Sequence, residues 1–328
     1  MKIGTIGTGF ITDWVMGQVL EYPENQYVAV YSRKEESAQT LKEKYQVPKI
    51  YTDLDQMLED DDIDCIYVAS PNSLHFEHAK KAMLAGKNAI VEKPFCSNAK
   101  ECEELIRICK ETGRFLFEAI TTIYNPNYLK IKEELEKIKP VKIVECNMSQ
   151  YSRKYDAFLN GDHPNVFTPK FSGGALMDIN VYNLHFIVGL FGMPKRVHYQ
   201  ANIKEGIDTS GVVTLEYENM TVSSVGSKDN IGMNFTQIQG ENGYILSQSA
   251  SSMTLNVSVQ LRNKESYDID LQKHDGAHYY YAGEILRMIE ENDLEGCYQK
   301  LEHSLNVVKV LDAARKDAGI VFDADRQI

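Results

Sequence analysis

The chain has 328 residues, a length that favours two domains over one average core. Hydrophobic residues make up 43% and charged residues 25% of it, as in an ordinary water-soluble globular protein. The formal net charge of -12 argues against nucleic acid as a partner, because this surface would repel phosphates at long range.

The chain start and the cysteines indicate a cytoplasmic protein. No basic segment followed by a long apolar one opens the chain, and no run of about 18 apolar residues suggests a membrane span. The six cysteines include no C-x-x-C pair and no Cys/His cluster with zinc spacing. We therefore expect reduced thiols, no structural metal and no contact with a membrane.

A short apolar strand, a glycine turn and a helix open the chain, at residues 2–6, Gly7 to Gly9 and beyond. This order is the context that a dinucleotide-binding fingerprint requires. Gly7 would permit the tight turn, and Gly9 would let backbone N–H groups approach a pyrophosphate. An ordinary strand–helix turn is the alternative, and Thr12 stands where the fingerprint has Gly or Ala. The residues expected at the cofactor in this segment are Gly7, Gly9, Phe10 and Ile11.

The second predicted strand, residues 28–31, ends in Ser32, Arg33 and Lys34. Sites that prefer NAD place an acid near this point to hold the ribose 2′-hydroxyl. Two cations stand here instead, and both could pair with the 2′-phosphate of NADP. The alternative is a helix start followed by solvated charges.

Another apolar strand, residues 65–68, is followed by Ser70, Pro71, Asn72 and His75. These residues would lie at the carboxyl edge of a parallel sheet, where ligands bind in such folds. Cofactor contact and a purely structural capping role are equally compatible with His75.

The next strand, residues 88–91, runs directly into Glu92, Lys93 and Pro94. A lysine placed where a buried strand surfaces would stand over the ligand at the same carboxyl edge. A solvated charged turn is the alternative. With a last strand at residues 114–117, six strands and their helices form a complete doubly wound unit within residues 1–120.

The pattern changes beyond residue 120. A helix at 126–138 and a long strand at 141–150 precede a polar, aromatic and irregular stretch, 151–170, typical of a lid or substrate loop. Residues 195–271 then predict about six antiparallel strands, and two helices close the chain. The expected fold class is α/β, with an N-terminal Rossmann parallel sheet and a C-terminal α+β domain, 121–328, built on a large open, mainly antiparallel sheet.

A second group of polar residues lies on a predicted apolar helix from 175 to about 190. Asp178, Tyr182 and His185 are spaced i, i+4 and i+7, which places them on one stripe of an α-helix. Such a stripe faces either a wet cleft or a satisfied buried network, and spacing alone leaves both open.

Four segments carry a resemblance: Gly7-x-Gly9, Ser70-Pro71-Asn72-x-x-His75, Glu92-Lys93-Pro94 and Gly173-Gly174-x-x-x-Asp178-x-x-x-Tyr182. Together they resemble the Gfo/Idh/MocA family of nicotinamide-dependent oxidoreductases, over nearly the whole chain. The resemblance implies an NAD(P)-binding Rossmann domain, 1–120, and a substrate-binding and oligomerisation domain, 121–328. It also implies a homodimer or homotetramer formed through the open C-terminal sheet.

The nearest resemblance is to the branch of dimeric dihydrodiol dehydrogenase, NADP D-xylose dehydrogenase and glucose-fructose oxidoreductase. Tyr182 stands where many members of the family carry His, as in that branch. Thr121 and Ile123 replace the Trp and Arg typical of it, which puts a shared substrate in doubt. The branch implies NADP(H), in agreement with Arg33 and Lys34, with NAD(H) as the alternative.

The predicted function is reversible hydride transfer between nicotinamide and a secondary alcohol or carbonyl of a sugar, polyol or dihydrodiol. Tyr182 is the expected acid/base, with its pKa lowered by Lys93, and Asp178 would orient Lys93 or a substrate hydroxyl. A competing assignment makes Lys93 itself the base. The alternative function is a dinucleotide-binding regulator or redox sensor without turnover, and a methyltransferase is a weaker third reading.

Overall fold

The computed structural model describes residues 1–326, and the chain divides into two units. The first contains Met1–Ala119 together with His278–Leu305, and the second contains Ile120–Ala277 together with the chain from Asn306 onward. The sequence prediction placed everything beyond residue 120 in the second domain. Helix α9 (Ala277–Glu290) and the first half of α10 (Leu294–Asp317) instead belong to the first unit.

Side-chain contacts explain why α9 belongs to the first unit. Gln18 accepts hydrogen bonds from the backbone N–H groups of His278 and Tyr279, at 2.9 and 3.2 Å. The Tyr22 ring stacks on the Tyr279 ring with centroids 4.6 Å apart. These contacts join residues about 260 positions apart, so no local sequence pattern predicts them.

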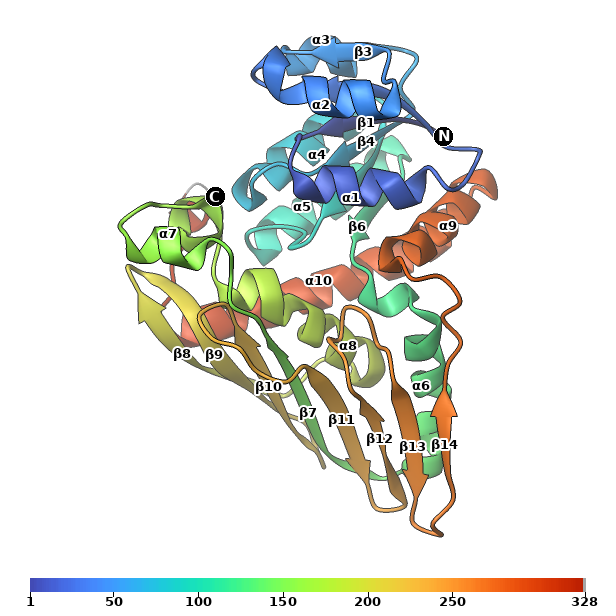
Figure 1. Ribbon diagram of the computed structural model, residues 1–328, viewed down its shortest axis with the longest axis vertical. Helices are drawn as coiled ribbons and strands as arrows, with labels where there is room; N and C mark the ends of the chain where they lie inside the picture. Colours follow the sequence, from blue (N-terminus) through green and yellow to red (C-terminus); the bar gives the residue numbers. More distant parts are fainter. Residues whose placement is uncertain (327–328) are drawn as a thin grey trace. The chain divides into compact units, whose positions relative to one another are not determined.

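The first unit is a six-stranded parallel sheet in the order β3-β2-β1-β4-β5-β6, flanked by helices (Figure 1). This order confirms the predicted doubly wound sheet. Its strands are β1 (Lys2–Ile6), β2 (Gln26–Tyr31), β3 (Lys49–Tyr51), β4 (Cys65–Val68), β5 (Asn88–Glu92) and β6 (Leu116–Ala119). Its further helices are α1 (Phe10–Val19), α2 (Glu35–Tyr45), α3 (Leu54–Leu58), α4 (His75–Leu84) and α5 (Ala99–Thr112), with a 3-10 turn η1 (Asn72–Leu74) before α4.

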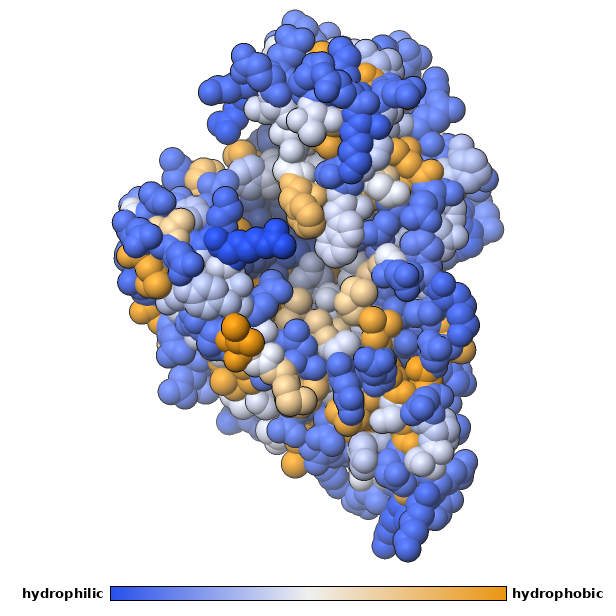
Figure 2. Space-filling model, in the orientation of Figure 1, coloured by the Kyte–Doolittle hydropathy of each residue, from blue (hydrophilic) through white to orange (hydrophobic). Residues whose placement is uncertain are grey.

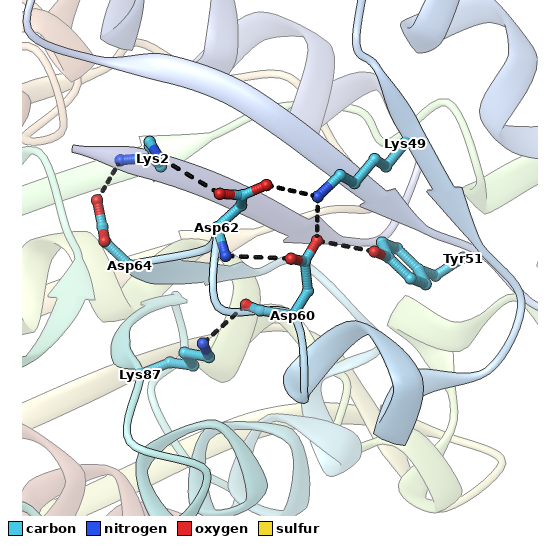
Figure 3. Close-up of polar contacts among 7 residues, drawn as sticks. All are labelled: Lys2, Lys49, Tyr51, Asp60, Asp62, Asp64 and Lys87. Atoms are coloured by element: carbon cyan, nitrogen blue, oxygen red, sulfur yellow. Dashed lines mark hydrogen bonds and ion pairs between the residues drawn. The ribbon is translucent and has the colours of Figure 1, made fainter.

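Polar side chains link β3 to the acidic loop before β4 (Figure 3). Lys49 binds the carboxylates of Asp60 and Asp62 at 2.8 and 2.9 Å, and the Tyr51 hydroxyl donates to Asp60 at 2.7 Å. The hydrogen bond from Lys49 is the main reason why the pKa of Asp60 is lowered to about 2. The acidic run before β4 thus ties β3 to the loop that leads into β4.

The second unit contains an eight-stranded sheet in the order β14-β13-β12-β11-β7-β10-β9-β8. It is mainly antiparallel, as predicted, but β7 and β10 pair in parallel at its centre. Its strands are β7 (Val141–Ser149), β8 (Arg196–Lys204), β9 (Ile207–Glu216), β10 (Thr221–Ser227), β11 (Phe235–Gly240), β12 (Gly243–Ser247), β13 (Val257–Leu261) and β14 (Ser266–Ile269).

Helices cover one face of this sheet (Figure 1). Helix α6 (Pro126–Ile138) packs on β12 and β13, while α8 (Val181–Phe191) and the π-helical turn η5 (Leu176–Asn180) pack on β7 and β10. The remaining short helices are η2 (Thr122–Tyr124), α7 (Tyr155–Leu159), η3 (Asn165–Phe167), η4 (Pro169–Phe171) and η6 (Asp323–Arg326). The stretch 151–170, predicted to be irregular, therefore contains helical turns.

One segment, Pro169–Phe191, is long and apolar enough to cross a membrane by length and composition, although the sequence analysis found no such run. Of its most apolar window, 72% is buried inside the protein, as in the core helix of a soluble protein. On the face drawn in Figure 2, apolar side chains lie scattered among polar ones. All six cysteines are buried, and none forms a disulfide bond.

Candidate active site

Four neighbouring strands of the first unit end at the same level of its sheet. Ile6, the last residue of β1, lies opposite Tyr31 of β2 and Val68 of β4, and Val68 lies opposite Val91 of β5. The segments after these strands therefore leave the sheet side by side at its carboxyl edge. They contain every residue that the sequence analysis assigned to the cofactor, except Glu92, which is the last residue of β5.

The glycine turn between β1 and α1 fits a dinucleotide. Gly7 has φ of +117°, and a Cβ there would lie 2.5 Å from the Ala69 carbonyl oxygen, so only glycine suits this turn. A Cβ built on Gly9 would meet no atom within 4 Å, and Gly9 is the N-cap of α1. Open space in front of a helix N-terminus is what a pyrophosphate requires. Phe10 and Ile11 form the first turn of α1.

The segment after β2 is exposed and basic. The Ser32 backbone N–H donates to the Tyr51 carbonyl at 3.0 Å, which fixes the start of the segment on β3. Arg33 and Lys34 are exposed, and Lys34 is the N-cap of α2 in an extended conformation. Two cations beside the glycine turn can serve an additional phosphate.

His75 is buried and is the first residue of α4. One ring nitrogen lies 2.9 Å from the Pro94 carbonyl oxygen and the other lies 2.9 Å from the Ser70 carbonyl oxygen. Burial lowers the pKa of His75. The ring therefore ties the segment after β4 to the segment after β5, which favours the structural interpretation over direct cofactor contact. Pro71 and Asn72, which lie between them, are partly exposed.

Glu92 and Lys93 have different surroundings although they are adjacent. Glu92 is buried, accepts a hydrogen bond from the Tyr67 hydroxyl, and has its pKa raised to about 7 by burial. The Lys93 side chain is partly exposed at the carboxyl edge. Glu92 was expected at the cofactor, but the structure places it inside the sheet, where it contacts Tyr67 of β4. The Lys93–Pro94 peptide bond is cis.

The predicted α-helical stripe of the second unit is altered by the π-helical turn. Asp178 lies within η5 and Tyr182 at the start of α8, and both are partly exposed, whereas His185 is fully buried. A π-turn has a wider period than an α-helix, so the i, i+4, i+7 alignment does not extend across it. Asp178 and Tyr182 remain accessible, and His185 belongs to the core.

The structure adds a residue that the sequence analysis missed. Lys228, directly after β10, forms an ion pair with Asp178. The Lys228 side chain is only 4% exposed, against 23% for Asp178. The two residues are 50 positions apart, and only the packing of η5 on β10 brings them together.

A second carboxylate supports the start of the same segment. Asp208 accepts from the Leu176 backbone N–H at 2.6 Å and from the Tyr199 hydroxyl at 2.7 Å. Burial raises the pKa of Asp208. Gly174 has φ of +103°, and a Cβ there would collide with the Asp208 carboxylate, which explains the glycine before η5.

The candidate catalytic residues belong to different units: Lys93 to the first, Asp178 and Tyr182 to the second. Within residues 1–326, no three His, Cys, Asp or Glu side chains gather as metal ligands would.

Two family models match the chain, one in each unit. Residues 1–120 match the family model of the GFO/IDH/MocA oxidoreductases with an NAD-binding Rossmann fold, and residues 129–246 match the GFO/IDH/MocA C-terminal domain.

Relatives match along nearly their full lengths. The chain is 37% identical to scyllo-inositol 2-dehydrogenase (NADP(+)) IolU of Bacillus subtilis, with 99% of each chain covered. It is 26% identical to a trans-1,2-dihydrobenzene-1,2-diol dehydrogenase of Danio rerio, with 94% of each covered. Among solved structures, KijD10, a 3-ketoreductase from Actinomadura kijaniata in complex with NADP and TDP-benzene, has the same fold (TM-score 0.80, 20% identity, 97% of each chain covered).

Proposed function

Because the chain belongs to the GFO/IDH/MocA family of NAD-binding oxidoreductases, we propose that it is an NADP(H)-dependent dehydrogenase of a cyclic polyol or sugar. The observation that carries this proposal is the 37% identity to IolU, an NADP(+)-dependent inositol dehydrogenase by name, over 99% of both chains. Arg33 and Lys34, exposed after β2, support the preference for NADP over NAD.

The nicotinamide cofactor would supply the hydride acceptor and donor. The residues that would hold it are the glycine turn with Gly7 and Gly9, the basic segment with Arg33 and Lys34, and the segments after β4 and β5. The backbone N–H groups at the start of α1 would face the pyrophosphate, and the Arg33 guanidinium would bind the 2′-phosphate as a planar fork.

One proton must move when an alcohol becomes a carbonyl, and we assign it to Tyr182. An unperturbed tyrosine, with a pKa near about 10, is a weak base at neutral pH, so it needs a nearby cation. Lys93 would supply this charge and bind the reacting oxygen. The competing assignment, with Lys93 as the base, remains a defined alternative.

The test of the cofactor and substrate classes is a panel of inositols, sugars and diols followed by absorbance of the reduced cofactor at saturating NADP and NAD. We expect turnover of a cyclic polyol or sugar with NADP and a lower KM for NADP than for NAD. Arg33→Ala should raise the KM for NADP about tenfold or more while changing that for NAD little, since a charged hydrogen bond is worth about 1.5–3 kcal/mol. Equal dissociation constants for the two cofactors in the unmodified protein would refute the NADP preference.

Two substitutions separate the proton-transfer schemes. Lys93→Met should abolish turnover in both schemes and leave cofactor binding nearly intact. Tyr182→Phe should abolish it only if Tyr182 is the acid/base, so activity above about a tenth of the unmodified rate would assign the proton to Lys93.

A regulator or sensor that binds the dinucleotide without turnover is the second candidate. Accessible Asp178 and Tyr182 disfavour it, because a sensor needs no proton-transfer group. Binding of NADP without turnover of any alcohol in the panel would support it.

We also propose a homodimer or homotetramer formed through the open sheet of the second unit. Exposed apolar side chains lie on the sheet face opposite the helices, at Ile143, Val212 and Tyr244. Sedimentation of the full chain tests this, and Val212→Lys should shift it toward the monomer. A monomer at micromolar concentration would refute the proposal.

A further inference from the structure

Lys228 connects segments of the second unit that are far apart in sequence. Its backbone N–H donates to the Thr209 carbonyl at 2.9 Å, and its carbonyl accepts from the Ser152 N–H at 2.9 Å. Its ammonium binds Asp178 and lies 5.3 Å from the centroid of the Phe167 ring. The main chain of Lys228 is therefore held from both sides, and its side chain starts from a fixed point.

The pair is buried at its cation and accessible at its anion. The Lys228 side chain is only 4% exposed, whereas the Asp178 side chain is 23% exposed. An ammonium held away from water needs an anionic partner. A ligand that reaches this part of the unit would meet the carboxylate before the ammonium.

The other carboxylates around Lys228 accept hydrogen bonds from other groups, although the Lys228 charge also opposes the rise in the pKa of Asp208. Asp208 on β9 binds the Tyr199 hydroxyl and the backbone N–H at the start of η5. Asp229, next to Lys228, accepts hydrogen bonds from hydroxyls of β9 and β10 at 2.7 to 2.9 Å. Burial acts to raise the pKa of Asp229, but the hydrogen bonds outweigh it and leave this pKa below its ordinary value. Tyr182 of α8 is the titratable group one turn beyond Asp178. Among the described residues, Asp178 carries the carboxylate ion-paired with Lys228.

We infer that Lys228 is a positioning residue of the substrate site, which keeps Asp178 ionised and in one orientation so that its carboxylate accepts a hydrogen bond from a substrate hydroxyl. The inference rests on the proposed function, since it gives the polyol or sugar a contact in the second unit. Only an ionised carboxylate is purely an acceptor, and a neighbouring ammonium favours that state. Lys228 acts through Asp178.

Lys228→Met removes the charge and keeps most of the side-chain volume. We expect KM for the alcohol to rise about tenfold or more, as expected for losing a hydrogen bond to a charged group. Cofactor affinity should stay unchanged, and the acid limb of kcat/KM should move to higher pH, because Asp178 would protonate more easily. Lys228→Arg keeps a cation and should restore the pH profile. An unchanged KM and acid limb in Lys228→Met would overturn the inference.

A double-mutant cycle with Asp178→Asn separates positioning from a general structural role. If Lys228 acts through Asp178, Lys228→Met should change KM little in the Asp178→Asn background. Additive effects on KM would overturn the inference. The double variant contains no unpaired buried charge, so it should fold even if Asp178→Asn alone, which leaves the buried Lys228 ammonium without its carboxylate, does not.

A measurement without turnover distinguishes this inference from the proposed function. The carboxyl carbon of Asp178, assigned by its loss in Asp178→Asn, can be titrated by NMR in the unmodified protein and in Lys228→Met. We expect a higher Asp178 pKa in Lys228→Met, and an identical pKa would overturn the inference. Failure of the unmodified protein to oxidise any alcohol of the panel would refute the proposed function alone, and the titration would still decide the ionisation role of Lys228.

Discussion

Neutralising Glu92 should stabilise the protein above neutral pH and leave it unchanged in acid. This carboxyl lies at the end of β5, buried against the Tyr67 hydroxyl, and burial raises its pKa from 4.5 to about 7. Between these pH values the folded protein keeps a proton that the unfolded chain has released. The free energy of unfolding therefore falls as the pH rises through this window and becomes constant above it.

The size of the effect follows from the two pKa values. At about 1.4 kcal/mol per pH unit, the interval from 4.5 to about 7 corresponds to about 3 kcal/mol. Glu92→Gln carries no charge at any pH, and its amide oxygen can still accept from Tyr67. The difference in the free energy of unfolding between Glu92→Gln and the unmodified protein should thus be about 3 kcal/mol more favourable to the variant at pH 8 than at pH 4.5.

Trp14 provides the assay, because it is the sole tryptophan and lies in α1 of the same unit. Urea unfolding followed by its fluorescence at several pH values gives the stability of the unit that contains Glu92. Glu104→Gln is the control. The partly exposed carboxylate of Glu104 binds Arg107, which lowers the pKa of Glu104, so its neutralisation removes a weak attraction. The same dependence on pH for Glu92→Gln and the unmodified protein would refute the reasoning.

Two further substitutions test how the units are held. Gly174→Ala should destabilise the second unit by about 3 kcal/mol, because it combines positive φ with a collision between the new Cβ and Asp208. Gly161→Ala, at φ of +90° with no atom near its Cβ, should cost about 1 kcal/mol. The midpoints of urea unfolding compare the two variants, and equal costs would contradict the collision at Gly174. Gln18→Ala should leave two backbone N–H groups at the start of α9 without their acceptor, so their hydrogen exchange should become faster. Unchanged protection of these N–H groups would show that the Gln18 side chain does not hold the helix.

The sequence predicted the parallel sheet and its carboxyl edge because their signals are local. A strand, a turn and a helix follow one another within about 20 residues around Gly7, and the same alternation repeats to β6. The family resemblance was also carried by short motifs, and the family comparisons confirm it.

The parts that the sequence did not predict depend on distant contacts or on small changes of helical period. The π-helical turn has the apolar composition of an α-helix, so nothing in the spacing of Asp178 and Tyr182 distinguishes the two. Lys228 looks like a solvated charge after a strand, and its partner becomes visible only when β10 pairs with β7 and packs under η5. His75 left two interpretations open, because the Pro94 carbonyl that binds its ring lies 19 residues further along the chain.

The return of residues 278–305 to the first unit has a consequence for how the protein is made. A nascent chain that has emerged only to Ala119 contains the whole parallel sheet but lacks α9, so Trp14, Gln18 and Tyr22 do not yet have their partners on that helix. The ribosome must synthesise the entire eight-stranded sheet before the first unit can acquire α9 and the first half of α10. A fragment that ends at residue 120 should therefore be less stable than the same residues in the full chain, and adding a separate 278–305 peptide should stabilise it in proportion to the peptide concentration.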